Sequence, residues 1–308
     1  MIKDTFRTAL PIIVLFFSFN ISFCQVSIFN PLLDKSRESE VKLVKNFQDL
    51  QNKLDEHSAK DSLNFHLQNL ETYPSSFRSQ IFIELISIHL NTESDSWKSE
   101  INNYIETSLW RKDVLINMIN LSNIEVKYPE KYDQILNYIH ENFNQIYYNR
   151  IEELKSTNII DELIWVNSIW QRDQDFRKYF MYNNLRDTAS LKALQYFDQE
   201  NLKSISKFIN DFGYPNFTMG TYNLNFALLH FNNPDLLNLE EFNKINISIW
   251  ESVVLGYTSL KDYCYIIDRY LVTNQKIAPL FGLYYPNDVT KEIIDSCTRN
   301  RLSIGLKL

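Results

Sequence analysis

The sequence predicts an all-α protein, in which a helical N-terminal region is followed by a mainly helical C-terminal domain with loops constrained by glycine and proline. A chain of this length with average composition would contain roughly 22 glycines, and this one contains 5 among 308 residues. Glycine supplies the positive φ angles of tight hairpin turns. Because none precedes Gly213, a hairpin-rich sheet is not expected before that position. Apolar residues spaced by three and four, the period of an amphipathic helix, give the second indication.

Residues 1–24 are expected to form an export signal. Lys3 and Arg7 make a short basic start, and residues 9–19 form an apolar stretch too short to span a bilayer as a helix. Cleavage is expected before Gln25, so the mature chain is predicted to be periplasmic or extracellular and to lack a transmembrane span. Two alternatives stay open: a lipid anchor on Cys24, and an N-terminal core helix that is not removed.

Residues 25–157 are expected to form a helical N-terminal domain. Helical spacing recurs within residues 41–54, 82–90, 101–109 and 115–119. Breaks are expected at Pro74, within residues 91–95 and at Pro129, and Pro129 is well placed to begin a long helix that continues to Leu154. Stacked helical hairpins remain an alternative, although the chain lacks the 34-residue tetratricopeptide signature.

Residues 158–308 are expected to form the C-terminal domain. Helical patterns cover residues 161–180, 199–212, 221–231, 239–255 and 260–272, and glycines and prolines separate the later ones. The change in composition places the domain boundary near residues 155–160. A chain of this length also agrees with two domains.

Composition and motifs exclude several classes of function. The net charge of −7 and the absence of a run of basic residues argue against nucleic acid as a partner. The chain contains no phosphate-binding glycine loop, no G-x-S-x-G and no C-x-x-C. After removal of the signal two cysteines remain, Cys264 and Cys297, either as one disulfide or as two buried thiols.

One ordered set of short motifs stands out in the second half of the chain. Its segments are Asp173-Gln174-Asp175-Phe176-Arg177, Asp198-Gln199-Glu200-Asn201, Gly213-Tyr214-Pro215, Gly220, Leu229-His230, Asp268-Arg269 and Phe281-Gly282. The set resembles a family of often exported bacterial proteins known as a domain of unknown function, with the pattern D-Q-x-x-R, D-x-x-N, G-x-P, G, Q-H, D-R and Q-x-Y-G. The resemblance covers residues 164–282. It implies a fold and the location of a site, but no reaction.

Two positions depart from that family pattern. Leu229 stands where the family has glutamine before the histidine, and Phe281 stands where the final motif has tyrosine. These departures are consistent with an altered or lost activity.

The candidate site residues are Asp173, Arg177, His230, Asp268 and Arg269. Asp173 and Arg177 are four apart, so on a helix they share a face and can form an ion pair. Asp268 and Arg269 are adjacent and point in different directions from a helix. For each group a purely structural role is the alternative: an ion pair that stabilises the fold, or a histidine buried in the core.

The sequence favours a binding, interaction or structural module over an enzyme, because it shows no nucleophile. Its partner is expected to be a protein or a small molecule. The alternative is a hydrolase or lyase of the cell envelope or extracellular space, with His230 as acid/base, Asp268 orienting it, and Arg177 or Arg269 holding an anion. A hard-cation site at His230 with Asp173, Asp175 and Asp198 is the weakest hypothesis, so no metal and no cofactor is predicted.

Overall fold

All regular elements that the structure describes are helices. The computed structural model describes residues 28–56, 67–68, 70–157, 159–183, 187–229, 239–286 and 289–307. Within these ranges it contains α-helices and two short 3-10 helices, and no strand, so the predicted all-α class is confirmed. None of the helices in these ranges has the length and apolar character needed to cross a membrane.

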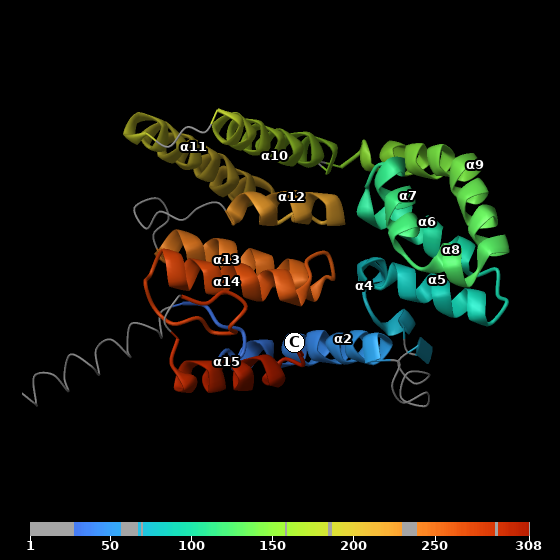
Figure 1. The fold of residues 1–308 in the computed structure, drawn as a ribbon, viewed down its shortest axis with the longest axis horizontal. Helices are drawn as coiled ribbons and strands as arrows, with labels where there is room; N and C mark the ends of the chain where they lie inside the picture. Colours follow the sequence, from blue (N-terminus) through green and yellow to red (C-terminus); the bar gives the residue numbers. More distant parts are fainter. Residues whose placement is uncertain are drawn as a thin grey trace, which may run out of the picture.

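The helices form two stacks, shown side by side in Figure 1. In that view the C-terminal stack has α10 and α11 uppermost, then α12, then α13 and α14, with α2 and α15 at the bottom. The helices of this stack are α2 (Glu38–Glu56), α10 (Ile159–Tyr182), α11 (Thr188–Phe212), α12 (Thr218–Leu228), α13 (Leu239–Val254), α14 (Leu260–Thr273) and α15 (Lys291–Ser303). One apolar core runs through it, from Val44 in α2 to Ile249 in α13 and Ile267 in α14.

The second stack is built around α6 (Trp97–Ser108), which packs against α4 (Ser75–Gln80), α5 (Phe82–Asn91) and α9 (Pro129–Leu154). Ile101 of α6 and Ile135 and Ile139 of α9 are completely buried in its core. The long α9 begins at Pro129, as predicted, because proline has no N–H to lose in a first turn. The remaining helices of this stack are α7 (Lys112–Leu121) and α8 (Ile124–Lys127).

The first described segment, residues 28–56, packs against the C-terminal helices. Trp250 Nε1 of α13 donates to Glu40 at 2.7 Å, and Asn246 Nδ2 donates to the Phe29 carbonyl at 2.8 Å. At its other end, Asn52 Nδ2 donates to the carbonyl of Gly305 at 2.8 Å. The division into domains of residues 25–157 and 158–308 stays a prediction. In the structure, these hydrogen bonds join the first of those segments to the second.

Two local predictions were wrong. Helix α11 begins at Thr188 rather than at residue 199, because Asp187 caps it by accepting from the Ser190 N–H at 3.0 Å. Asp198 therefore lies in the middle of a helix. Gly220 is inside α12 and does not precede it, and a Cβ at this position would overlap the Phe217 ring.

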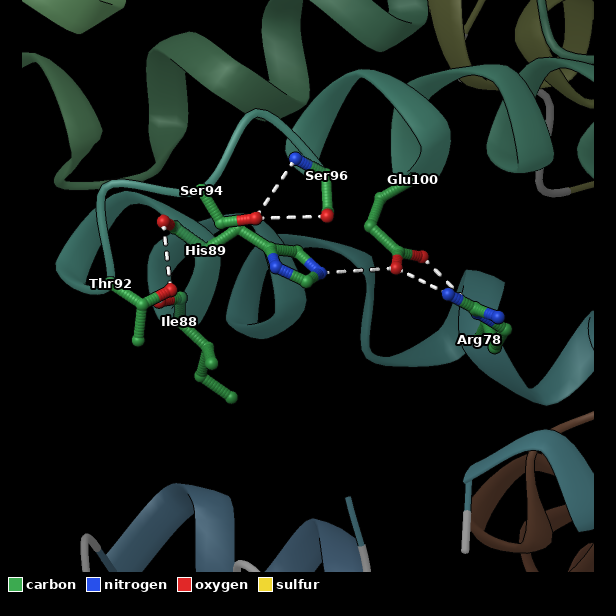
Figure 2. A network of polar contacts seen from close by, with 7 residues as sticks. All are labelled: Arg78, Ile88, His89, Thr92, Ser94, Ser96 and Glu100. Atoms are coloured by element: carbon green, nitrogen blue, oxygen red, sulfur yellow. Dashed lines mark hydrogen bonds and ion pairs between the residues drawn. The ribbon is translucent and has the colours of Figure 1, made fainter. Parts of the chain in front are cut away.

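A buried ion pair joins α4 to α6 in the second stack, and a histidine of α5 lies beside it (Figure 2). Glu100, only 2% exposed, receives hydrogen bonds from Arg78, one of them from Nε at 3.2 Å. The His89 ring lies on the other side, with Nε2 3.3 Å from Glu100 Oε1. These three residues come from separate helices, so no spacing in the sequence predicts that they meet.

We expect Glu100→Gln to lower the free energy of unfolding by about 2 kcal/mol, because it leaves the half-buried Arg78 guanidinium without its counter-charge. Glu153→Gln is the matched control, since Glu153 pairs with Arg150 at 3.0 Å on the surface and is 65% exposed. Its loss should change stability by less than about 0.5 kcal/mol. Urea unfolding of both variants measures the difference, and equal effects would contradict a structural role for Glu100.

Candidate functional site

Asp173 and Arg177 form an ion pair between α10 and α11. Arg177 Nε donates to Asp173 Oδ1 at 3.0 Å, and Arg177 Nη2 donates to Asp198 Oδ1 of α11 at 2.5 Å. Asp173 is completely buried, and Gln174 Nε2 donates to its second oxygen at 3.0 Å. The pairing that the four-residue spacing predicted is confirmed, and Asp198 extends it to the neighbouring helix.

More contacts between α10 and α11 surround this pair. Arg172 Nε donates to Asn201 Oδ1 at 2.9 Å, and Asn201 is completely buried. The rings of Phe176 and Phe197 stack with their centroids 4.0 Å apart. The D-Q-x-x-R and D-x-x-N motifs therefore meet, and the contacts that their charged side chains make hold two helices together.

Asp268, on α14, contacts a different part of the protein. Its Oδ1 accepts from the backbone N–H groups of Leu280 and Phe281 at 2.7 and 2.8 Å, and its Oδ2 accepts from Leu283 N–H at 2.7 Å. The Asp268 side chain is completely buried. These N–H groups belong to the segment of residues 279–283, which we call the 279–283 loop. Helix α15 also holds this loop, because Asn300 Nδ2 donates to the Leu280 carbonyl at 2.8 Å and Arg301 donates to the Phe281 carbonyl.

Phe281, one of the two departures from the family pattern, is a core residue. It is 1% exposed and lies near the Tyr263 ring. Gly282 follows it at a φ of 68°, and a Cβ there would overlap the Tyr285 hydroxyl and approach Arg301 Nη1 to 2.8 Å. The left-handed backbone is the main reason for glycine at this position, because the atoms that a Cβ would meet are the ends of side chains that can shift.

Arg269 points away from Asp268, as their adjacency predicted. Its guanidinium lies over the ring of Tyr284, 5.5 Å from the ring centroid. Asp268 and Arg269 therefore both contact the segment that follows α14, but through different groups.

Burial raises the pKa of Asp268 from 3.8 to about 6 against the opposing effect of the backbone N–H groups. Between about pH 4 and pH 6 the folded protein therefore keeps a proton that the unfolded chain releases. The stability due to this group is complete below about pH 4 and is lost as the pH rises to about 6.

We compare wild type with Asp268→Asn, which has no titrating group at this position. The unfolding free energy of wild type minus that of Asp268→Asn should fall by about 2–3 kcal/mol from pH 4 to pH 6. Urea titrations from pH 4 to pH 7 measure it, and a rising difference would contradict the raised pKa.

Cys264 and Cys297 are both free and buried in the structure. Burial raises the pKa of the Cys264 thiol well above its ordinary value and that of Cys297 to about 11. Cys297 Sγ donates to the carbonyl of Pro279 at 3.3 Å, so this thiol also contacts the 279–283 loop. Protonated thiols of this kind are poor nucleophiles.

Several predicted features lie outside the described residues, namely His230, the export signal of residues 1–24 and Cys24. The enzyme hypothesis depends on His230 and stays a prediction. In the part of the chain that is described, no group of three or more His, Cys, Asp or Glu side chains is arranged to hold a metal ion.

A cleft of about 780 Å³ lies where the two stacks meet, and none of the motif residues that the structure describes lines it. We call it the junction cleft. Its walls come from the turn between α6 and α7 and from α7, α9, α10 and α12. Its aromatic lining consists of Trp110, Tyr147, Trp170 and Tyr222. Its polar lining consists of Arg111, Asn167, Ser168, Gln171 and Asn223, and the rest is apolar.

The backbone at one wall of the junction cleft has an unusual conformation. Leu109 ends α6 with a φ of 54°, in the left-handed region that a bulky side chain rarely adopts. Leu109 is 1% exposed and packs with Phe217 and Met219 from the other stack. This turn places Trp110 against Tyr222, with centroids 5.5 Å apart and the rings at 67°. Strained backbone of this kind often marks a functional site.

Comparison of the chain with protein-family models, with curated proteins and with solved structures found no match. The resemblance to the bacterial family of unknown function therefore stays a prediction. A function for this chain rests on the geometry of its own residues.

Proposed function

We propose that this is an exported helical binding protein that holds a small molecule in the junction cleft. The cleft carries the proposal, because its volume and its mixture of aromatic walls with a few polar groups are typical of ligand sites. It also lies between two stacks of helices, where such sites commonly occur. Export, predicted from residues 1–24, is part of this proposal.

The lining of the junction cleft favours binding over catalysis. Among the described residues, this lining contains no Asp, Glu, His, Cys or Lys side chain. Its hydroxyl groups, on Ser168, Tyr147 and Tyr222, therefore have no base within the lining to activate them as nucleophiles. The acidic motif residues instead have partners that explain them: Asp173 with Arg177, and Asp268 with the 279–283 loop. Their arrangement supports a structural role for the motif residues and leaves the cleft as the ligand site.

A ligand-detected NMR screen of small-molecule fragments against the full chain tests the proposal. We expect fragments to bind wild type and to lose at least tenfold in affinity for Trp110→Ala, because a buried aromatic wall commonly contributes about 2 kcal/mol to binding. Tyr182→Ala is the control, since Tyr182 is 85% exposed on α10 and is not a lining residue. Fragments that bind equally to all three proteins, or no fragment binding at all, would contradict the proposal.

A further inference from the structure

We infer that the ligand of the junction cleft is a neutral carbohydrate. This inference rests on the proposed function and names the chemical class of its ligand. Three properties of the lining carry it: the angle between the aromatic walls, the hydrogen-bonding groups that a pair of amides presents, and the balanced charge.

The aromatic walls meet at an angle. Trp110 and Tyr222 contact edge to face at 67°, and the Tyr222 residue is 50% exposed. A flat aromatic ligand can stack on one of these faces and meet the other with its edge. A puckered ring also fits two walls at a wide angle, because it can place its apolar C–H face on one wall and its edge on the other. A sugar ring has this shape.

Two amides present a mixed donor and acceptor edge in the same cleft. Asn223 Nδ2 donates to Asn167 Oδ1 at 2.8 Å, and both residues line the cleft. This bond leaves Asn167 Nδ2 as a donor and Asn223 Oδ1 as an acceptor. Gln171 Nε2 donates to Asp175 at 2.8 Å, which leaves its Oε1 as a second acceptor. A hydroxyl group both donates and accepts, so adjacent sugar hydroxyls fit this edge.

The charge of the lining argues against strongly ionic ligands. Among the described lining residues Arg111 is the one with a charged side chain, and it already pairs with Asp113 through both Nε, at 3.1 Å from Oδ1, and Nη2. A phosphate or carboxylate ligand would need donors with unbalanced positive charge, and a cationic ligand would need a carboxylate in the lining. A neutral polyhydroxylated ring needs neither.

Isothermal titration with neutral trisaccharides tests the inference, using cellotriose, maltotriose and N,N′,N″-triacetylchitotriose at up to about 1 mM. Trigalacturonate and adenosine are the charged and flat comparison ligands. We expect at least one neutral trisaccharide to bind, with an affinity that does not change between low salt and about 0.5 M salt. Tyr222→Ala and Asn167→Asp should each weaken it at least tenfold, and Tyr182→Ala should not. Asn167→Asp keeps the size of the side chain but replaces the donor by a charge.

The outcomes separate this inference from the proposed function. If fragments bind in the junction cleft but no neutral trisaccharide does, the ligand class is wrong and the binding site stands. Preferential binding of adenosine or trigalacturonate likewise overturns the carbohydrate class alone. If neither fragments nor saccharides bind, the proposed function falls as well. Trisaccharide binding that survives both substitutions would place the sugar elsewhere and overturn the inference.

Discussion

Replacing Asp268 by alanine should lower the free energy of unfolding by about 3–5 kcal/mol. In the wild-type protein this carboxylate accepts hydrogen bonds from three backbone N–H groups, those of Leu280, Phe281 and Leu283. The Asp268 side chain is completely buried, and so is the Phe281 backbone bond. Each donor left without a partner away from water costs about 1–3 kcal/mol.

The effect should spread to the segment that carries these N–H groups. The 279–283 loop is held between Asp268 on α14 and Arg301 on α15, so loss of one side frees the Phe281 ring from the core. Amide hydrogen exchange in the Asp268→Ala protein should therefore increase most in the 279–283 loop. Chemical denaturation gives the global free energy, and exchange identifies where the protection is lost.

Two further variants show whether the three hydrogen bonds are the cause. Asp295→Ala removes an exposed carboxylate from nearby α15 and should change stability by less than about 0.5 kcal/mol. Asp268→Asn keeps an acceptor for Leu280 and Phe281 but turns an amide donor toward Leu283 N–H, so it should fall between wild type and alanine. Equal stability of Asp268→Ala and Asp295→Ala would mean that the loop does not depend on this residue.

The fold class was predictable because helical periodicity is local. Most predicted helices appear with small shifts at their ends, and α9 begins and ends where Pro129 and Leu154 placed it. The beginning of α11 was missed for a physical reason. Its first turns are largely exposed, and the Asp198-Gln199-Glu200 segment looks like a helix start. The spacing of Leu191, Leu194 and Phe197 behind the true cap, Asp187, is the signal that could have shown the start of this helix.

The site was less predictable because it depends on tertiary contacts. The spacing of Asp173 and Arg177 predicted their ion pair, since both lie on one helix. The partners of Asp268 lie 12 to 15 residues further on, in a loop with no regular structure to fix its distance. The junction cleft combines segments near residues 110, 147, 170 and 222. No spacing in the sequence brings these together.

Gly256→Ala should lower the free energy of unfolding by about 3–4 kcal/mol, through backbone strain and a collision with Phe77. Gly256 follows α13 with a φ of 82°, which an L side chain rarely adopts. An added Cβ would overlap the Phe77 ring and lie 2.8 Å from the Phe77 backbone nitrogen. Gln80 also donates to the Gly256 carbonyl at 2.7 Å, so the backbone at this point is fixed from the opposite side.

Gly213→Ala separates the two contributions. Gly213 has a φ of 81°, but no atom of the described residues lies within 4 Å of the Cβ that alanine would add. Its substitution should therefore cost only the backbone strain, about 1–2 kcal/mol. The additional loss in Gly256→Ala measures the collision. If both variants lose the same amount in urea unfolding, the close approach of Phe77 has no energetic effect.

A double-mutant cycle with Phe77→Leu then tests the contact itself. Phe77 stacks on Phe47 at 4.2 Å in a core formed by residues 47–85, whereas Gly256 belongs to the C-terminal stack. Because leucine removes the ring that the new methyl group meets, the double variant should be at least about 1 kcal/mol more stable than additivity requires. Such a coupling would show that positions 77 and 256 interact directly across the predicted domain division, whereas strict additivity would mean that the added methyl group does not meet the Phe77 ring.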